Sequence, residues 1–257
     1  MGDRAPRRYW LTGAGNGIGA ALAEAILQGG AHLAISTRHA QVCEAFSARF
    51  PGQVLALPGD LSDSQTVRSM GEQILQHWGS LDTVILNAGT GEFVEDHPHP
   101  DTAMELLVRS NLLATSLCIQ TASPLLCSGT TPHLVGLASA VTYLSPSVTE
   151  AGGSAMAELF VQARVDLMPW GVDVTLVHPG FNSPTGEPDD CFTRPGHWSA
   201  DDAAADVLRH LNERPREVRL AAASMTALWP LHTPTEAVPA DCNPHQARNR
   251  SPIKGQP

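Results

Sequence analysis

The residues with the clearest chemical use in this sequence are four closely spaced glycines, in the segment Thr12-Gly13-Ala14-Gly15-Asn16-Gly17-Ile18-Gly19. The segment follows a short apolar stretch, Arg8 to Leu11, and opens a helix-forming stretch, Ile18 to Gln28. Glycine is needed where a turn is tight and where the backbone must approach a pyrophosphate closely. The helix N-terminus behind such a turn offers free N–H groups and the positive end of the helix dipole. We therefore predict a dinucleotide-phosphate site rather than a purely structural turn, formed by Gly13, Gly15, Asn16, Gly17, Ile18 and Gly19.

The elements that would position this site alternate along the chain. Short apolar runs predict strands at 8–11, 32–36, 54–57, 83–86, 133–138, 172–177 and 217–220. Helix patterns separate them, at 18–28, from the capping box Ser62-x-x-Gln65 to about 77, at 105–126, at 155–167, and from Ser199-x-x-Asp202 to 211. Strands joined by helix-length crossovers form a parallel sheet, and continuous apolar strands are buried on both faces. The predicted fold is α/β, a single Rossmann-type, doubly wound parallel sheet with helices on both faces.

Composition limits the remaining possibilities. The length of 257 residues suits one domain, predicted at 8–232 after a short extension at 1–7 and before a disordered, proline-rich tail at 233–257. A net charge of −10 disfavours nucleic acid as a partner. No run of about 18 apolar residues predicts a membrane span, and no signal peptide is recognised, so we expect a cytoplasmic protein. Five scattered cysteines and the pair His97 and His99 give no metal-ligand pattern, and no metal is expected.

The order of several further motifs resembles the short-chain dehydrogenase/reductase family. The pattern Thr-Gly-x-x-x-Gly-Ile-Gly recurs there with Asp60-Leu61, which the resemblance places at the adenine, and with Asn87-Ala88-Gly89, beneath the cofactor. Asn111 matches a helix asparagine of the family, and Pro179-Gly180 matches its turn near the nicotinamide. The resemblance covers about residues 8 to 220. It implies NAD(P)(H) binding, hydride transfer to or from a small carbonyl or alcohol substrate, and a homodimer or homotetramer formed through the helices near 105–126 and 155–167.

The end of the second strand indicates which dinucleotide is preferred. NAD-binding proteins place a carboxylate there to hold the ribose 2′-hydroxyl. This sequence has Ser36-Thr37-Arg38 instead. An arginine can pair with a 2′-phosphate, and the two hydroxyls can hydrogen-bond it. NADP is therefore favoured over NAD, the alternative being that Arg38 is a solvated loop residue.

The catalytic pattern of the family is broken in this sequence. The resemblance assigns Ser139 to the serine that positions a substrate carbonyl, and Asn111 completes the set. The family then has a tyrosine thirteen residues after the serine and a lysine four further on, but those positions hold Gly152 and Met156. An unperturbed phenol titrates near ~10, so proton transfer at neutral pH depends on such a lysine. The sole lysine, Lys254, lies in the predicted tail, which leaves Tyr143 as a candidate proton donor without a lysine.

The turn after the sixth strand departs as well. Relatives tend to have Pro-Gly-Phe-x-x-Thr-Pro, whereas here Pro179-Gly180 continues to Ser183-Pro184-Thr185. The departures from the family pattern affect the residues of proton transfer and of the nicotinamide end, whereas the phosphate-binding residues match the family. Two functions follow: an oxidoreductase with impaired or unconventional proton transfer, or a non-catalytic dinucleotide-binding sensor or partner subunit, a pseudoenzyme. A scaffold that binds nothing is the third alternative, because a fold does not determine function.

Overall fold

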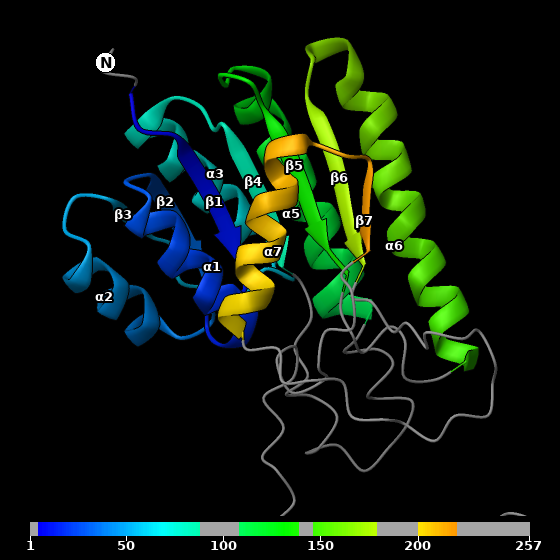
Figure 1. Ribbon diagram of the computed structural model, residues 1–257, viewed down its shortest axis with the longest axis horizontal. Helices are drawn as coiled ribbons and strands as arrows, with labels where there is room; N and C mark the ends of the chain where they lie inside the picture. The colour runs from blue at the N-terminus through cyan, green and yellow to red at the C-terminus, as the bar shows by residue number, and fades with distance from the viewer. Residues whose placement is uncertain (1–4, 88–107, 139–145, 179–199, 220–257) are drawn as a thin grey trace, which may run out of the picture.

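The computed structural model describes residues 5–87, 108–138, 146–178 and 200–219. Its strands form one seven-stranded sheet in the order β3-β2-β1-β4-β5-β6-β7, with every neighbouring pair parallel. All the arrows in Figure 1 accordingly point the same way. The strands are β1 (Arg8–Thr12), β2 (His32–Ser36), β3 (Val54–Ala56), β4 (Thr83–Asn87), β5 (His133–Leu137), β6 (Asp173–His178) and β7 (Glu217–Arg219).

Helices connect these strands. They are α1 (Gly17–Gln28), α2 (Ala40–Arg49), α3 (Ser64–Trp78), α5 (Ala114–Cys127), α6 (Pro146–Leu167) and α7 (Ala200–Glu213), with a π-helical turn η2 (Val108–Leu113) and a 3-10 turn η4 (Met168–Trp170). The chain leaves β1 toward β2 on one side and later returns to pair β4 on the other side. The carboxyl ends of β1 and β4 therefore flank the point at which the winding direction reverses, where ligands bind in doubly wound sheets.

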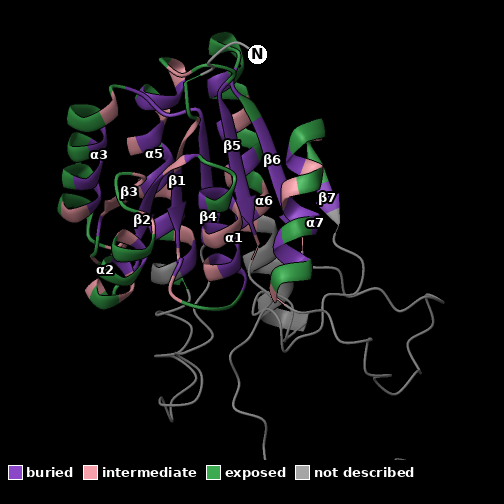
Figure 2. Cartoon of the chain, turned by 60° about the vertical axis from the view of Figure 1, so that its left-hand side comes forward, coloured by how far each residue is buried: buried purple, intermediate pink, exposed green. Residues whose placement is uncertain are grey.

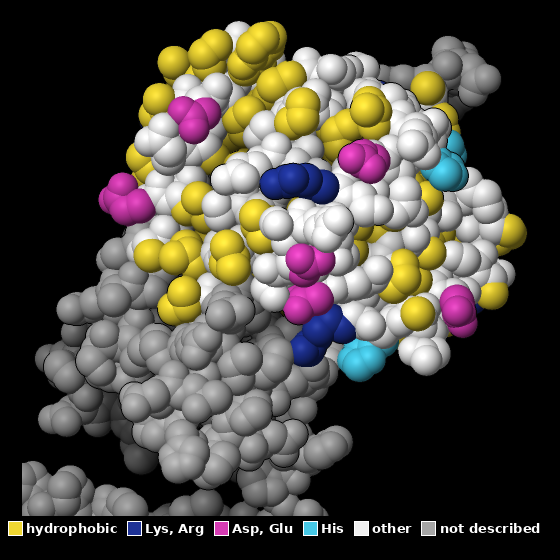
Figure 3. All heavy atoms as spheres, turned by 180° about the vertical axis from the view of Figure 1, so that it is seen from behind, with side chains coloured by type: hydrophobic (Ala, Val, Ile, Leu, Met, Phe, Trp, Pro, Cys, Tyr) yellow, Lys and Arg dark blue, Asp and Glu magenta, His cyan; other side chains and the backbone are white. Residues whose placement is uncertain are grey.

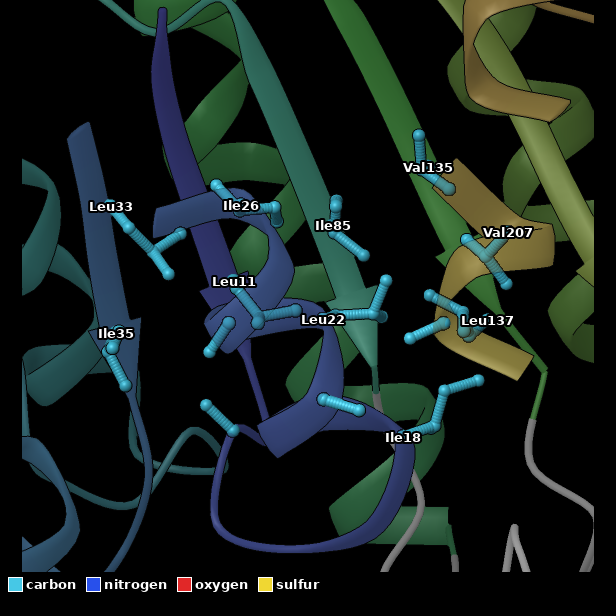
Figure 4. Packing of buried hydrophobic residues seen from close by; sticks show 14 of the residues in the cluster. Leu11, Ile18, Leu22, Ile26, Leu33, Ile35, Ile85, Val135, Leu137 and Val207 are labelled. Atoms are coloured by element: carbon cyan, nitrogen blue, oxygen red, sulfur yellow. The ribbon is translucent and has the colours of Figure 1, made fainter. Parts of the chain in front are cut away.

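Two apolar clusters cover the two faces of the sheet. One joins α1, α2 and α7 to strand residues such as Leu11, Ile85 and Val135 (Figure 4). The other joins α3, α5 and α6 to residues such as Trp10 and Leu134. Adjacent residues of one strand thus belong to opposite clusters, and Figure 2 shows that the inner strands are largely buried. The prediction of a single doubly wound α/β sheet is confirmed.

Three local predictions need correction. Helix α2 was not predicted, because only Cys43 and Phe46 of its residues are buried and the apolar pattern is correspondingly faint. The N-cap of α3 is Asp63 and not Ser62, since the Asp63 carboxylate accepts hydrogen bonds from the backbone N–H groups of Gln65 and Thr66. Helix α6 begins at Pro146, nine residues before the predicted start at Ala155; proline suits a first helical turn because its missing N–H needs no partner there.

The amino-terminal edge of the sheet is held by a buried ion pair. The Arg8 guanidinium contacts both carboxylate oxygens of Asp82, with Nη2 2.9 Å from Oδ1 and Nε 3.1 Å from Oδ2. The same carboxylate accepts the backbone N–H groups of Arg8 at 2.9 Å and of Thr130 at 2.8 Å. Burial alone would raise the pKa of Asp82, but these hydrogen bonds and the Arg8 charge outweigh it and lower the pKa. Asp82 thereby ties β1, β4 and the segment before β5 together.

Candidate functional site

The glycine turn lies at the carboxyl end of β1 and is fitted against the end of β4. Gly13 adopts a left-handed φ of 67°, and a Cβ there would lie 2.3 Å from the carbonyl oxygen of Asn87. A Cβ on Gly19 would lie 2.0 Å from the Gly13 carbonyl oxygen. Since real Cβ atoms do not approach so closely, both positions require glycine. The predicted need for glycine is thereby explained at these two positions.

Asn87 fixes this turn through two hydrogen bonds. Its backbone N–H donates to Thr12 Oγ1 at 3.0 Å, and its side-chain Nδ2 donates to the Gly13 carbonyl at 3.0 Å. The first residues of the turn are also tied to β2, because the Gly13 N–H donates to the Ser36 carbonyl at 2.9 Å. Thr12 was not singled out in the sequence except as the start of the motif, although its hydroxyl accepts one of these bonds. The turn is thus held in place before any ligand binds.

Helix α1 begins directly behind the turn. Asn16 is its N-cap residue in an extended conformation, and Gly17 has a left-handed φ of 51°. The Asn16 side chain makes no capping hydrogen bond to this helix end, and the first turn of α1 carries no acidic residue. Ile18 anchors the helix in the core, where it is 6% exposed. The N–H groups and dipole of α1 are consequently directed at the space beside Gly13 to Gly17, where a phosphate would be stabilised.

Ser36, Thr37 and Arg38, which were expected to select the dinucleotide, have different environments at the end of β2. Ser36 is fully buried, and its Oγ accepts from Trp10 Nε1 at 2.8 Å and donates to Met70 Sδ at 3.5 Å. The expectation that its hydroxyl contacts a 2′-phosphate is therefore wrong, because Trp10 and Met70 engage it inside the core. Thr37 is buried against the glycine turn, with Oγ1 3.2 Å from the position of a Gly15 Cβ. Arg38 is exposed beside them.

The expected adenine site follows β3. Asp60 is exposed, and its Oδ1 accepts both the backbone N–H and the hydroxyl of Ser62 at 2.9 Å. Leu61 packs against the apolar cluster that contains Trp10. This loop is fastened to β2 by a 3.0 Å hydrogen bond from the Gly59 N–H to the Thr37 carbonyl. Asp60, Leu61 and Arg38 thus belong to connected loops at one edge of the sheet.

The catalytic end is only partly described. Asn111 is buried within the π-helical turn η2, a geometry frequent at functional sites. Several predicted site residues lie outside the described residues: Ser139, Tyr143, Ala88, Gly89, Pro179 and Gly180. The same holds for His97 and His99. Among the described residues no cluster of His, Cys, Asp or Glu is placed to hold a metal ion. None of the described helices is both long and apolar enough to span a membrane.

Helix α6 carries Gly152 and Met156, the two positions at which the sequence predicts a break in the family pattern. Gly152 and Met156 are one helical turn apart in it, which is the spacing of residues on a common face. Met156 is 7% exposed and belongs to the apolar cluster with Phe160 and Leu134. The Phe160 ring packs directly on β5, so closely that a Cβ on Gly136 would lie 2.0 Å from it. Met156, which the sequence aligns with the family lysine, is therefore part of the hydrophobic core.

The Arg164 guanidinium, further along α6, binds backbone carbonyls. Its Nη2 donates to the carbonyls of Arg216 at 3.1 Å and Val174 at 3.4 Å, near the beginning of β6 and β7. That is the amino-terminal edge of the sheet, opposite the glycine turn. Arg164 is the only Lys or Arg among the described residues of α6.

A family model described as short chain dehydrogenase matches residues 9–188. The chain belongs to the short-chain dehydrogenase family. A curated relative, a rhamnolipids biosynthesis 3-oxoacyl-[acyl-carrier-protein] reductase of Pseudomonas aeruginosa, is 30% identical over 118 residues, 45% of this chain and 46% of that protein. The chain thus spans about half the length of that relative. A sorbitol dehydrogenase of Cereibacter sphaeroides is 24% identical over 217 residues, 82% of this chain and 80% of its own.

Solved structures agree with the fold. A short-chain dehydrogenase from Streptomyces avermitilis matches with a TM-score of 0.68 and 20% identity, covering 87% of this chain and 92% of that one. An alcohol dehydrogenase from the archaeon Thermococcus sibiricus, complexed with 5-hydroxy-NADP, matches with a TM-score of 0.65 and 20% identity over 83% and 95% of the two chains. The family is one of dinucleotide-binding oxidoreductases.

Proposed function

We propose that this protein binds NADP(H) in preference to NAD(H). The observation that carries the proposal is the glycine turn, held by Asn87 and Thr12 in front of the first turn of α1. Arg38 supports the choice of NADP because it is an exposed cation after the end of β2, and it follows Thr37, whose hydroxyl lies against Gly15. When bound, the dinucleotide would supply or accept a hydride. Gly13 to Gly19 would hold its phosphates, and Asp60 and Leu61 would adjoin its adenine.

The proposed reaction is hydride transfer between the nicotinamide and a small carbonyl or alcohol, with an unconventional proton donor. Ordering two reactants side by side lowers the barrier even without an acid–base pair. A second candidate, a non-catalytic NADP(H)-binding sensor or partner subunit, is favoured by one observation: Met156 is buried in an apolar cluster where the family has a cation. Turnover of NADPH with a panel of ketones and aldehydes separates the two, since the second candidate gives none.

Replacing Arg38 by alanine is expected to weaken NADPH binding by roughly 10- to 100-fold, because a hydrogen bond to a charged group contributes about 1.5–3 kcal/mol. NADH binding should not change, since NADH lacks the 2′-phosphate. Fluorescence titration of the purified protein with each dinucleotide measures both affinities. Arg49→Ala is the matched control, because Arg49 lies at the far end of α2 and pairs with Glu24. Equal loss of both affinities would show that Arg38 does not recognise the 2′-phosphate.

Restoring the family pair is expected to create activity. In Gly152→Tyr with Met156→Lys, NADPH-dependent carbonyl reduction should rise at least ~10-fold over the unmodified protein, because general acid–base catalysis contributes 10²- to 10⁴-fold. Gly152→Phe with Met156→Leu controls for size without supplying the proton donor or the charge. No gain in a variant that still binds NADPH would argue against the assignment of these two positions. Substantial activity of the unmodified protein that Tyr143→Phe abolishes would instead identify Tyr143 as the donor.

We also propose that the protein is a homodimer formed through α5 and α6. Helix α6 and the turn η4 expose Val161, Val165, Met168 and Trp170, between 46% and 70% each. Figure 3 shows apolar side chains gathered on the side of the molecule where α6 lies, and such patches mark interfaces. Val165→Glu should shift the sedimentation coefficient to that of a monomer. Leu75→Glu, at an equally exposed site on α3, should not, and a monomeric unmodified protein would contradict the proposal.

A further inference from the structure

The short turn between α7 and β7 is fastened to the amino-terminal edge of the sheet. Arg214, in this turn, has a left-handed φ of 53°, which is unfavourable for a residue with a side chain. Its Nη1 lies 2.6 Å from Asp173 Oδ2, and its Nη2 donates to the Thr131 carbonyl at 2.8 Å. The Arg216 carbonyl accepts the Leu176 N–H at 3.0 Å. We refer to residues 214–216 with these bonds as the β7 latch, since β7 itself is an edge strand of three residues.

A buried histidine lies directly beneath the latch. His133 is 2% exposed, and its Nε2 is 2.8 Å from Thr175 Oγ1. The Thr175 hydroxyl donates to the Pro215 carbonyl at 2.5 Å. Because the hydroxyl has one proton, it accepts from His133, which therefore carries its proton on Nε2. A chain of hydrogen bonds thus runs from His133, the first residue of β5, through Thr175 of β6 to Pro215 in the latch.

The surroundings of His133 disfavour its protonated, imidazolium form. The cations that act on it are Arg214 in the latch and Arg7 before β1, and the carboxylate that acts on it is Asp173 on β6; the Asp82 carboxylate before β4 is directed to Arg8 and the Thr130 N–H instead. Asp173 is paired with Arg214 and Asp82 with Arg8. Burial first, and the Arg214 charge second, lower the pKa of His133 to about 4. A proton on this ring therefore opposes the closed arrangement.

We propose that His133 controls an acid-released latch: its protonation detaches the 214–216 turn and β7 from the sheet while the remaining strands stay paired. Detachment takes Arg214 into water and exposes the ring. Asp173, whose register partner across the β5–β6 pair is His133, then exchanges Arg214 for the imidazolium. The edge strand is the part that moves because only three residue pairs join it to β6.

The sign of the effect follows from the two protonation equilibria. The pKa of His133 is lowered in the closed form, so the open form binds more protons between pH 6.5 and about 4. The closed form is fully favoured above pH 6.5 and loses its advantage as the pH falls. For an open form with an ordinary histidine, the opening constant at pH 5.0 exceeds that at pH 7.5 by roughly 25-fold.

Hydrogen exchange of the full chain, followed by mass spectrometry at pH 7.5 and 5.0 and corrected for intrinsic exchange rates, tests the proposal. Peptides covering Leu176 and 216–219 should lose protection by roughly 25-fold at pH 5.0, while peptides covering β1 and β4 keep theirs. His133→Gln retains a donor for Thr175 without titrating, and it should abolish the difference. His77→Gln, at an exposed histidine of α3, should preserve it.

Two results would overturn the proposal. Equal protection of the β7 peptides at both pH values would show that His133 controls no opening. Parallel loss of protection in β1, β4 and β7 would show global acid unfolding instead of a local release. The unmodified protein alone decides between these results and the expected one, so the test stands even where His133→Gln does not fold.

Discussion

Gly19→Ala is expected to weaken NADPH binding by at least ~100-fold, equivalent to about 2.7 kcal/mol. The added Cβ would lie 2.0 Å from the Gly13 carbonyl oxygen and 2.7 Å from Asn87 Nδ2. The start of α1 must then move away from the turn, and the N–H groups that face the phosphates move with it. The free energy of unfolding should also fall, by about 1–3 kcal/mol, as in overpacked sites. Fluorescence titration measures the first effect and urea denaturation the second.

Gly29→Ala is the matched control at the other end of the same helix. Gly29 has a φ of −72°, which any residue adopts, and a Cβ there would be 3.3 Å from the nearest atom, the Ile26 carbonyl oxygen. Its NADPH affinity should remain that of the unmodified protein. If Gly19→Ala bound NADPH normally, the glycine turn would not be the phosphate site. If it were fully stable as well, the close approach of Gly19 to Gly13 would be incorrect.

Asp82→Ala is expected to destabilise the fold by about 2–3 kcal/mol, less than the roughly 3–5 kcal/mol for a fully buried ion pair, because the Arg8 side chain is 24% exposed. The Asp82 side chain is 5% exposed and accepts from Arg8 and from the Thr130 N–H. Without it, the Arg8 guanidinium keeps only its 3.1 Å hydrogen bond to the Trp78 carbonyl among the described contacts. Urea denaturation at pH 7 measures the change.

The Glu24–Arg49 pair provides the control for Asp82. It has a similar length, 2.7 Å, but lies on the surface with side chains 26% and 58% exposed. Glu24→Ala should therefore cost less than about 1 kcal/mol. The lowered pKa of Asp82 adds a pH dependence: its contribution is complete above the ordinary aspartate pKa and is lost as the pH falls below it. Equal effects of the two substitutions would show that the Asp82 pair contributes no more than a surface pair.

The sequence predicted the fold well because its strands are continuous apolar runs and its glycines sit at a sharp turn. Those signals are local. The role of Ser36 could not be predicted, since it depends on Trp10, a residue 26 positions away that reaches its hydroxyl only in the folded sheet. The π-helical turn around Asn111 likewise has no local cause in Val108–Leu113, which contains no proline or glycine.

Other differences have equally specific causes. Asp63 displaces Ser62 as a cap because a carboxylate accepts two N–H groups at once, and the Thr66 hydroxyl strengthens it further. The substitution of Met156 was visible in the sequence, but its burial against Phe160 was not, because that depends on how α6 packs on β5. The alignment of Gly152 and Met156 with the family pair stays a prediction, whereas the burial of Met156 is seen only in the fold.

The order of the strands has a consequence for how the chain is made. Synthesis delivers β1, β2 and β3 first, and each joins the edge left by the one before. The strands that follow then extend the opposite edge, from β4 next to β1 out to β7. No strand has to be inserted between two that are already paired, so the sheet can grow outward from β1 as the chain emerges from the ribosome. The ion pair between Arg8 and Asp82 would form when β4 arrives and would join the two halves of the sheet.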